Sequence, residues 1–199
     1  AEAVEVILEA IHKAGYKAGE QVAIALDPAA SELYEEETKT YNLRREGKKL
    51  TGEQMVAFWK HWVEQYPIVS IEDGLAEDDW DGWKQLTAAM GANIQLVGDD
   101  IFVTNTRRIK KGVDIGAANA VLIKPNQVGT LSDTCDAISL AHQHGYKTVM
   151  SHRSGETEDA TIAHLGVAFG CHGMKTGAVS GERTAKLNEL IRIEETVKS

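Results

Sequence analysis

Short apolar segments alternate with longer segments of helical periodicity, and this alternation repeats six times along the 199-residue chain. The apolar segments are largely continuous, which is typical of parallel strands that helices cover on both faces. The repeat therefore predicts an α/β protein built from consecutive βα units. The expected strands are residues 21–27, 68–73, 94–100, 120–126, 146–152 and 173–178.

Helical segments separate these strands. Residues 50–66 carry the clearest signal, because Thr51 and Gln54 have the spacing of a capping box and an apolar stripe follows them. Residues 28–49 are rich in charged residues and do not follow the alternation of strands and helices. We expect a solvated loop there, with a small hairpin as the alternative. The other expected helices are residues 1–15, 78–91, 105–116, 132–145, 156–170 and 182–195.

An ionisable residue ends each of the six expected strands. In chain order these residues are Asp27, Glu72, Asp99, Lys124, His152 and Lys175. The carboxyl ends of barrel strands converge on the face that carries the active site, whereas an open doubly wound sheet would spread them along a line. The sequence also has no GxGxxG or GxxxxGK[ST] phosphate loop. We therefore expect a TIM-type barrel, represented here by six consecutive βα units of an incomplete barrel.

Each ionisable residue has a purely structural interpretation when it is taken alone. An aspartate after a strand commonly caps the next helix, and Asp73, Asp78, Asp79 and Asp100 are candidates for that role. A lone lysine can be a salt-bridge partner, and a lone histidine can be a core residue. Six such residues in register are not independent accidents, so we interpret them together as a functional site.

The residue types at these strand ends indicate a metal-assisted proton abstraction. Asp27, Glu72 and Asp99 would form an oxygen cage, which suits Mg²⁺ better than zinc or copper. Lys124 and Lys175 would lie across from the metal, where crowding and desolvation favour a neutral amine that can act as a base. A base that faces a divalent cation is suited to remove a proton α to a carboxylate.

The segment SHRSGETED, residues 151–159, adds groups that can bind an anion. Arg153 offers a planar fork for a phosphate, and Ser154 adds a hydroxyl donor. We expect a helix to begin near Thr157 and to direct its free N–H groups toward the anion. His152 could donate to the reacting group or shuttle a proton. Helix capping alone is the alternative for Ser154 and Thr157, but capping does not require Arg153.

Charge and composition exclude several other classes of function. The chain has 21 lysine and arginine residues against 30 aspartate and glutamate residues, and the resulting net charge of −9 makes nucleic-acid binding unlikely. No apolar stretch is long enough to span a membrane, and residues 1–15 do not resemble a signal peptide. The two cysteines fit no disulfide framework, so we expect a reducing compartment, the cytoplasm.

Seven segments of the sequence resemble the enolase (phosphopyruvate hydratase) family. The segments occur in the order found in the family and extend over nearly the whole chain. They are LDPAASE, SIEDGLAEDDW, GDDIFVTN, LIKPNQVGT, SHRSGETED, KTGA and NELIRIEE. The pair SHRSGETED and NQVGT is highly specific. By this resemblance, the chain is the C-terminal (βα)₆ portion of an enolase barrel.

The resemblance implies a Mg²⁺-dependent dehydration of 2-phosphoglycerate to phosphoenolpyruvate, a glycolytic lyase reaction. It assigns the principal Mg²⁺ to the three carboxylates and the removal of the α-proton to Lys124. It further implies that Lys175 contacts the substrate carboxylate, that Arg153 and Ser154 hold the phosphate, and that His152 lies near the leaving hydroxyl. Pairing a lysine base with Mg²⁺ is a known pattern of the enolase superfamily.

The resemblance also marks two departures. The segment TGAVSGE, residues 176–182, is one residue shorter than the family form and lacks its arginine. Family members carry an N-terminal α+β domain and two further barrel strands, which supply the general-acid glutamate and the mobile loop of the second Mg²⁺ site. We therefore expect residues 1–199 to be a single barrel portion that is inactive by itself, in a parent enzyme that forms dimers or larger homo-oligomers.

Two other functions stay open at this stage. The chain could be a non-catalytic binding surface, because some family members bind plasminogen or the RNA degradosome and occur at the cell surface or as secreted proteins. It could also belong to a racemase or muconate-type enzyme of the same superfamily. Arg153 and Ser154 favour a phosphorylated substrate over the substrates of those relatives.

Overall fold

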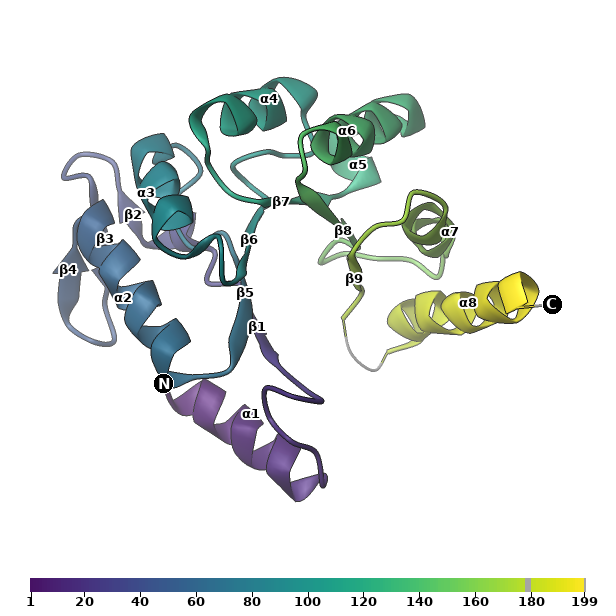
Figure 1. Ribbon diagram of the computed structural model, residues 1–199, viewed down its shortest axis with the longest axis horizontal. Helices are drawn as coiled ribbons and strands as arrows, with labels where there is room; N and C mark the ends of the chain where they lie inside the picture. Colours follow the sequence, from purple (N-terminus) through teal and green to yellow (C-terminus); the bar gives the residue numbers. More distant parts are fainter. Residues whose placement is uncertain (178–179, 199) are drawn as a thin grey trace. The chain divides into compact units, whose positions relative to one another are not determined.

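The computed structural model describes residues 1–177 and 180–198, which form two compact units. The first unit contains Ala1–Ile101 and Asp114–Asn119. The second contains Phe102–Val113 and the described residues from Ala120 onward. Each unit carries three parallel strands, and each is considered by itself below (Figure 1).

The first unit combines three parallel strands with a separate antiparallel sheet. The parallel strands are β1 (Ile24–Leu26), β5 (Ile68–Glu72) and β6 (Gln95–Gly98), and the antiparallel strands are β2 (Tyr34–Glu35), β3 (Thr40–Leu43) and β4 (Lys48–Leu50). Its helices are α1 (Glu2–Lys13), the 3₁₀ helix η1 (Ala30–Leu33), α2 (Gly52–Gln65) and α3 (Trp80–Met90). Helices α2 and α3 lie beside β5 and β6 (Figure 1).

The second unit continues the same alternation. Its parallel strands are β7 (Ala120–Ile123), β8 (Lys147–Ser151) and β9 (Gly173–Lys175). Its helices are α5 (Pro125–Val128), α6 (Leu131–Gln143), α7 (Thr161–Ala168) and α8 (Gly181–Lys198), with most of α4 (Thr106–Ile115). Six parallel strands that alternate with helices in chain order confirm the predicted α/β class.

The packing explains why the sequences of the strands are continuous apolar segments. All four residues of β7 are buried, as are Ile71 of β5 and Leu96 of β6. Trp83 and Leu86 of α3 are fully buried in the core of the first unit. Strands buried on both faces have no position that favours a polar side chain until they end. The predicted site residues accordingly lie at the carboxyl ends of the strands, where this burial ends.

Residues 28–49 do not form the solvated loop that the sequence favoured. They fold into η1 and the antiparallel sheet β2–β3–β4, in which Tyr41 pairs with Tyr34 on one side and with Leu50 on the other. Tyr41 is fully buried although it lies in a segment rich in charged residues. Burial of that ring supplies the apolar contact that a short charged sheet otherwise lacks. The alternative of a small hairpin was closer to the observed structure.

Helix boundaries agree with the sequence most closely where a cap is present. The Thr51 hydroxyl accepts a hydrogen bond from the Gln54 N–H, and the Gln54 side chain accepts one from the Thr51 N–H, which completes the predicted capping box. The expected apolar stripe of α1 is only partly buried, because Val4 and Ile11 are buried whereas Ile7 is 48% exposed.

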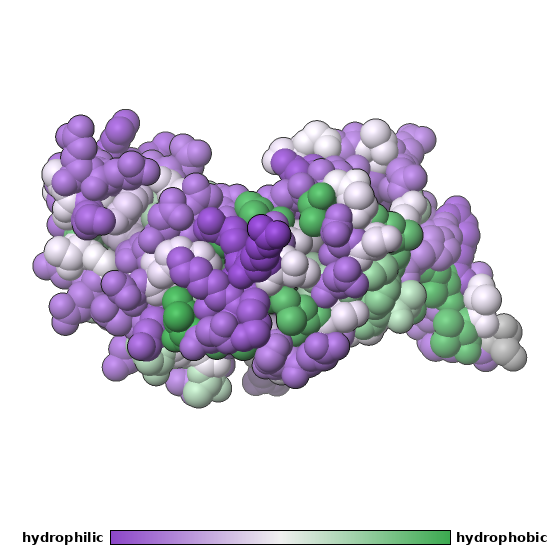
Figure 2. Space-filling view, turned by 90° about the horizontal axis from the view of Figure 1, so that it is seen from above, coloured by the Kyte–Doolittle hydropathy of each residue, from purple (hydrophilic) through white to green (hydrophobic). Residues whose placement is uncertain are grey.

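The surface is mainly hydrophilic, as the composition predicts. Figure 2 shows one face on which hydrophilic residues dominate and hydrophobic residues form small separate patches. Within the described part of the chain, no helix has both the length and the apolar character that crossing a bilayer requires.

We expect Tyr41→Phe to lower the free energy of unfolding by about 1–3 kcal/mol. The buried hydroxyl donates to Asp79 Oδ2 at 2.7 Å and accepts from the Ala76 N–H at 3.0 Å, so its removal leaves a buried N–H and a half-buried carboxylate oxygen without this partner. Urea unfolding followed by tryptophan fluorescence measures the loss. Tyr34→Phe is the matched control, because the Tyr34 hydroxyl makes no hydrogen bond to a described residue. Equal losses of unfolding free energy in Tyr41→Phe and Tyr34→Phe would refute the stabilising role of the Tyr41 hydroxyl.

Candidate functional site

The three predicted metal ligands lie at the carboxyl ends of β1, β5 and β6. The sheet register pairs Leu26 with Ile71. The residues that follow them, Asp27 and Glu72, therefore lie opposite each other on neighbouring strands. Glu72 pairs with Val97, two residues before Asp99. Glu72 and Asp99 are each 6% exposed, whereas Asp27 is exposed. The parallel register thus brings the three carboxylates to one edge of the first unit.

Asp73 connects the ends of these three strands. Its Oδ1 accepts from the Asp99 N–H and its Oδ2 from the Asp100 N–H, both at 3.0 Å. Its N–H donates to the Val97 carbonyl at 3.0 Å, and its carbonyl accepts from the Ala30 N–H at 3.0 Å. Its φ of 44° turns the chain sharply after Glu72. One residue thereby fixes the backbone next to all three predicted ligands.

The carboxyl group of Asp73 has an unusual environment. Burial raises its pKa to about 7, the nearby carboxylates of Asp99 and Asp100 add to this shift, and the two N–H donors oppose it. The sequence suggested a helix cap for this residue, which is wrong because both oxygens bind the loop after β6. Asp79, in contrast, does cap α3 by accepting from the Gly82 N–H at 3.0 Å.

The donor chemistry at this edge fits a hard divalent cation. Ligand atoms of Asp73, Asp99 and Asp100 lie within 4.8 Å of one another, so this cluster could hold a metal ion. Both oxygens of Asp73 already accept backbone N–H groups, which makes it better suited to position Asp99 than to coordinate. The predicted set Asp27, Glu72 and Asp99 offers carboxylates only, the ligand type that Mg²⁺ favours.

The predicted cationic residues lie at the strand ends of the second unit. Lys124 follows β7, and its N–H donates to the Thr104 hydroxyl at 2.9 Å, a group that is fully buried. Pro125 then starts the single turn of α5. His152 follows β8, and its N–H donates to the carbonyl of Lys175, the last residue of β9, at 3.0 Å. His152 and Lys175 are therefore held side by side.

A cavity of about 230 Å³ opens at these strand ends. His152, Arg153 and Glu156 line it together with Pro125 and Asn126, so two strand ends contribute to it. Arg153 is half-buried and Ser154 is exposed. A cavity of this size accommodates a small phosphorylated metabolite better than a macromolecule.

The helix after His152 begins later than the sequence predicts. We expected a start near Thr157, but α7 begins at Thr161, whose N–H donates to Asp159 Oδ1 at 2.8 Å. The carbonyls of the preceding loop are occupied by side chains of α8: Arg183 binds those of residues 153 and 154, and Lys186 binds that of residue 157. The predicted start near Thr157 is wrong by four residues, but Thr161 and Ile162 of α7 line the cavity, so the role of the helix N–H groups toward an anion stays a prediction.

The ring of His152 is confined between its neighbours. Its Nδ1 is buried and makes no hydrogen bond within the described chain. A Cβ added to Gly177, whose φ is 76°, would lie 3.0 Å from His152 Cε1 and 3.3 Å from Arg183 Cδ. Burial lowers the pKa of His152, and the positive charges of Arg183 and Lys175 lower it further. His152 is therefore a neutral imidazole at pH 7.

Sequence reasoning did not identify Asp73, Gly177, Arg183 or Lys186 as parts of the site. The only local signals were an aspartate next to Glu72 and a glycine two residues after Lys175. The shortened segment noted at 176–182 includes residues 178–179, which lie outside the described residues.

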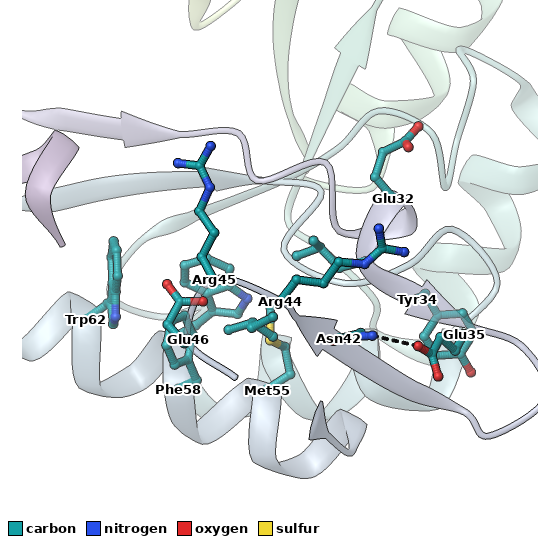
Figure 3. A pocket seen from close by; sticks show the side chains of 13 residues that line it. Glu32, Tyr34, Glu35, Asn42, Arg44, Arg45, Glu46, Met55, Phe58 and Trp62 are labelled. Carbon is teal, nitrogen blue, oxygen red and sulfur yellow. Dashed lines mark hydrogen bonds between the residues drawn. The ribbon is translucent and has the colours of Figure 1, made fainter. Parts of the chain in front are cut away.

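A larger cavity of about 470 Å³ lies elsewhere in the first unit (Figure 3). Its walls are the antiparallel sheet and α2, from which Met55, Phe58 and Trp62 point toward it, while Arg44 and Arg45 stand at its edge. None of the predicted site residues lines it. The concentration of ionisable groups at the parallel strand ends makes that region, and not this cavity, the candidate catalytic site.

Comparison with known protein families identifies the family of the chain. The family model described as "Enolase, C-terminal TIM barrel domain" matches residues 1–199. The match confirms the predicted fold class, in which six consecutive βα units form part of a TIM barrel.

We expect the ring of His152 to titrate below pH 6.5, its ordinary value, because burial disfavours the charged form. An NMR titration of the ring protons, assigned with His152→Gln, measures this directly. The unfolded chain binds the proton more readily than the folded chain does. The stability contributed by this group is therefore present above pH 6.5 and is lost as the pH falls below it. A midpoint at or above 6.5 would contradict the described burial.

Proposed function

Because the chain belongs to the family of enolase C-terminal TIM barrel domains, we propose that its enzyme dehydrates 2-phosphoglycerate to phosphoenolpyruvate with Mg²⁺ as cofactor. Residues 1–199 would provide the metal ligands, the base and the phosphate contacts. A general-acid glutamate would come from elsewhere in the parent enzyme.

The observation that carries this proposal is the cavity of the second unit. Arg153 and His152 both line it, and the His152 N–H donates to the carbonyl of Lys175. A guanidinium binds the three oxygens of a phosphate with paired hydrogen bonds. An adjacent lysine suits the substrate carboxylate. An α-hydroxy or muconate-type substrate without phosphate would leave Arg153 without a partner, which disfavours other reactions of the superfamily.

We assign the proton transfer to Lys124. Its amine would take the proton from the carbon α to the carboxylate, and the electron pair of the broken C–H bond would move into the carboxylate. Bound Mg²⁺ would neutralise the charge that develops on the carboxylate oxygens. The charge then returns to form the C=C bond while the β-hydroxyl takes up a proton and leaves as water. His152, which is neutral at pH 7, would hydrogen-bond the departing hydroxyl without adding charge.

The burial of the metal edge supports the assignment of Asp27, Glu72 and Asp99 to Mg²⁺. Two of the three carboxylates are almost fully enclosed, and a buried carboxylate requires a cation or hydrogen-bond donors to stay ionised. Bound Mg²⁺ would supply such a cation to this set.

We expect Lys124→Ala to lower kcat for 2-phosphoglycerate by roughly 10²–10⁴-fold, the usual contribution of a general base. Exchange of the substrate α-proton with deuterated water, followed by NMR, reports the first step separately from overall turnover. Lys147→Ala is the matched control, because Lys147 is an exposed lysine at the opposite end of the neighbouring strand β8. Undiminished α-proton exchange in Lys124→Ala would refute the assignment of the base.

We expect Asp73→Asn to weaken Mg²⁺ binding by roughly 10–100-fold, as is common for groups that orient metal ligands. An amide has one acceptor oxygen, so either the Asp99 or the Asp100 N–H loses its bond, and the backbone that carries Asp99 is released. Isothermal titration calorimetry with Mg²⁺ measures the change. Asp81→Asn, at an exposed position on α3, removes the same charge without this contact. Equal Mg²⁺ affinity in both variants would show that Asp73 has no positioning role.

A further inference from the structure

The loop between β8 and α7, residues 152–160, receives hydrogen bonds from side chains of α8. Arg183 Nη1 donates to the Arg153 carbonyl at 2.9 Å, and its Nη2 donates to the Ser154 carbonyl at 3.0 Å. Lys186 Nζ donates to the Thr157 carbonyl. Two side chains, one helical turn apart, thus fix three carbonyl groups of the loop that carries the predicted phosphate contacts.

Lys186 is a fully buried lysine, which is rare unless the ammonium group has partners. Besides the loop carbonyl, its Nζ donates to the Glu182 carbonyl at 2.9 Å and lies 3.8 Å from Glu156 Oε1. The Glu156 carboxylate accepts from the N–H groups of Arg153 at 3.4 Å and of Thr157 at 3.0 Å. The buried cation therefore stabilises both the carbonyls of the loop and the carboxylate that binds its N–H groups.

Arg183 has little freedom to adopt another arrangement. Its side chain is 14% exposed, and its Cδ and Nε lie within 3.4 Å of the position that a Cβ on Gly177 would occupy. The fork of a guanidinium matches two adjacent carbonyl groups, and a lysine ammonium cannot reproduce that geometry. The absence of a side chain at Gly177 is what lets Arg183 lie close to the ring of His152.

We propose that Arg183 and Lys186 are positioning residues that hold the loop in its phosphate-binding shape before the substrate arrives. The carbonyls of Arg153 and Ser154 are turned to α8, while the Arg153 residue lines the cavity. A loop that had to become ordered on binding would lose affinity through its entropy. The inference rests on the proposed function only for the identity of the substrate, since the contacts themselves involve no ligand.

Hydrogen exchange in the free protein tests the contacts directly. Arg183→Gln should increase the exchange rates of the amides of residues 153–158 by at least roughly tenfold, because the loop opens more often without its carbonyl partners. Arg192→Gln is the matched control, since Arg192 lies on the same helix, is 66% exposed and pairs with Glu189 of that helix. Unchanged exchange in Arg183→Gln would overturn the proposal whatever the enzyme does.

Steady-state kinetics with 2-phosphoglycerate tests the consequence. Arg183→Gln should raise KM by roughly tenfold or more with a smaller change in kcat, while the Mg²⁺ affinity stays unchanged, because the predicted metal ligands lie in the other unit. Arg183→Lys should not restore KM, since one ammonium cannot bridge two carbonyls. Restoration by lysine would overturn the proposal and would indicate that residue 183 contacts the phosphate as a point charge.

Lys186→Met is the second variant and keeps the volume of the buried side chain without its charge. It should increase the exchange of the Thr157 region and raise KM in the same direction as Arg183→Gln. An unchanged KM in both variants would overturn the proposal. A wild-type enzyme that does not convert 2-phosphoglycerate would refute the proposed function, whereas the exchange measurement would still decide on the role of α8.

Discussion

Every parallel strand in this protein ends at backbone N–H and C=O groups that the sheet no longer pairs, and buried groups of this kind need partners. Charged and hydroxyl side chains supply those partners here. Asp73 accepts the N–H groups of Asp99 and Asp100, and the Thr104 hydroxyl accepts the N–H of Lys124. The conformation of the candidate site depends on these bonds, because they fix the backbone from which the functional side chains extend.

The side chains that bind these backbone groups have opposite charges in the two units. In the first unit a carboxylate binds N–H groups, and the residues that it arranges are acidic, which suits a cation. In the second unit the cations of α8 bind carbonyl groups, and the loop that they arrange carries Arg153, which suits an anion. Each unit thus carries strand ends of one predominant charge, acidic in the first unit and basic in the second. The net charge of −9 makes this local basic cluster necessary for an anionic substrate.

The elements that the sequence predicted well are those with a local signal. The capping box of Thr51 and Gln54 formed as expected, and the apolar segments became parallel strands with the ionisable residues at their carboxyl ends. The errors share one cause. The start of α7 was misplaced because the loop before it is bound by side chains about 30 residues further along, where Arg183 and Lys186 donate to its carbonyl groups. The sheet in residues 28–49 was underestimated because Tyr41 is buried through its contact with Asp79, far away in the sequence.

The sequence by itself determined the βα repeat, the residue that ends each strand and the resemblance to the enolase family, because each of these follows from periodicity or from a contiguous motif. Only the tertiary structure revealed that Asp73 is a clamp and not a helix cap, and that Gly177 makes room for Arg183 beside His152. These roles arise where separate segments meet. The physical reason is that a hydrogen bond to the backbone can come from any side chain that the fold brings near, so the sequence around the acceptor carries no trace of its donor.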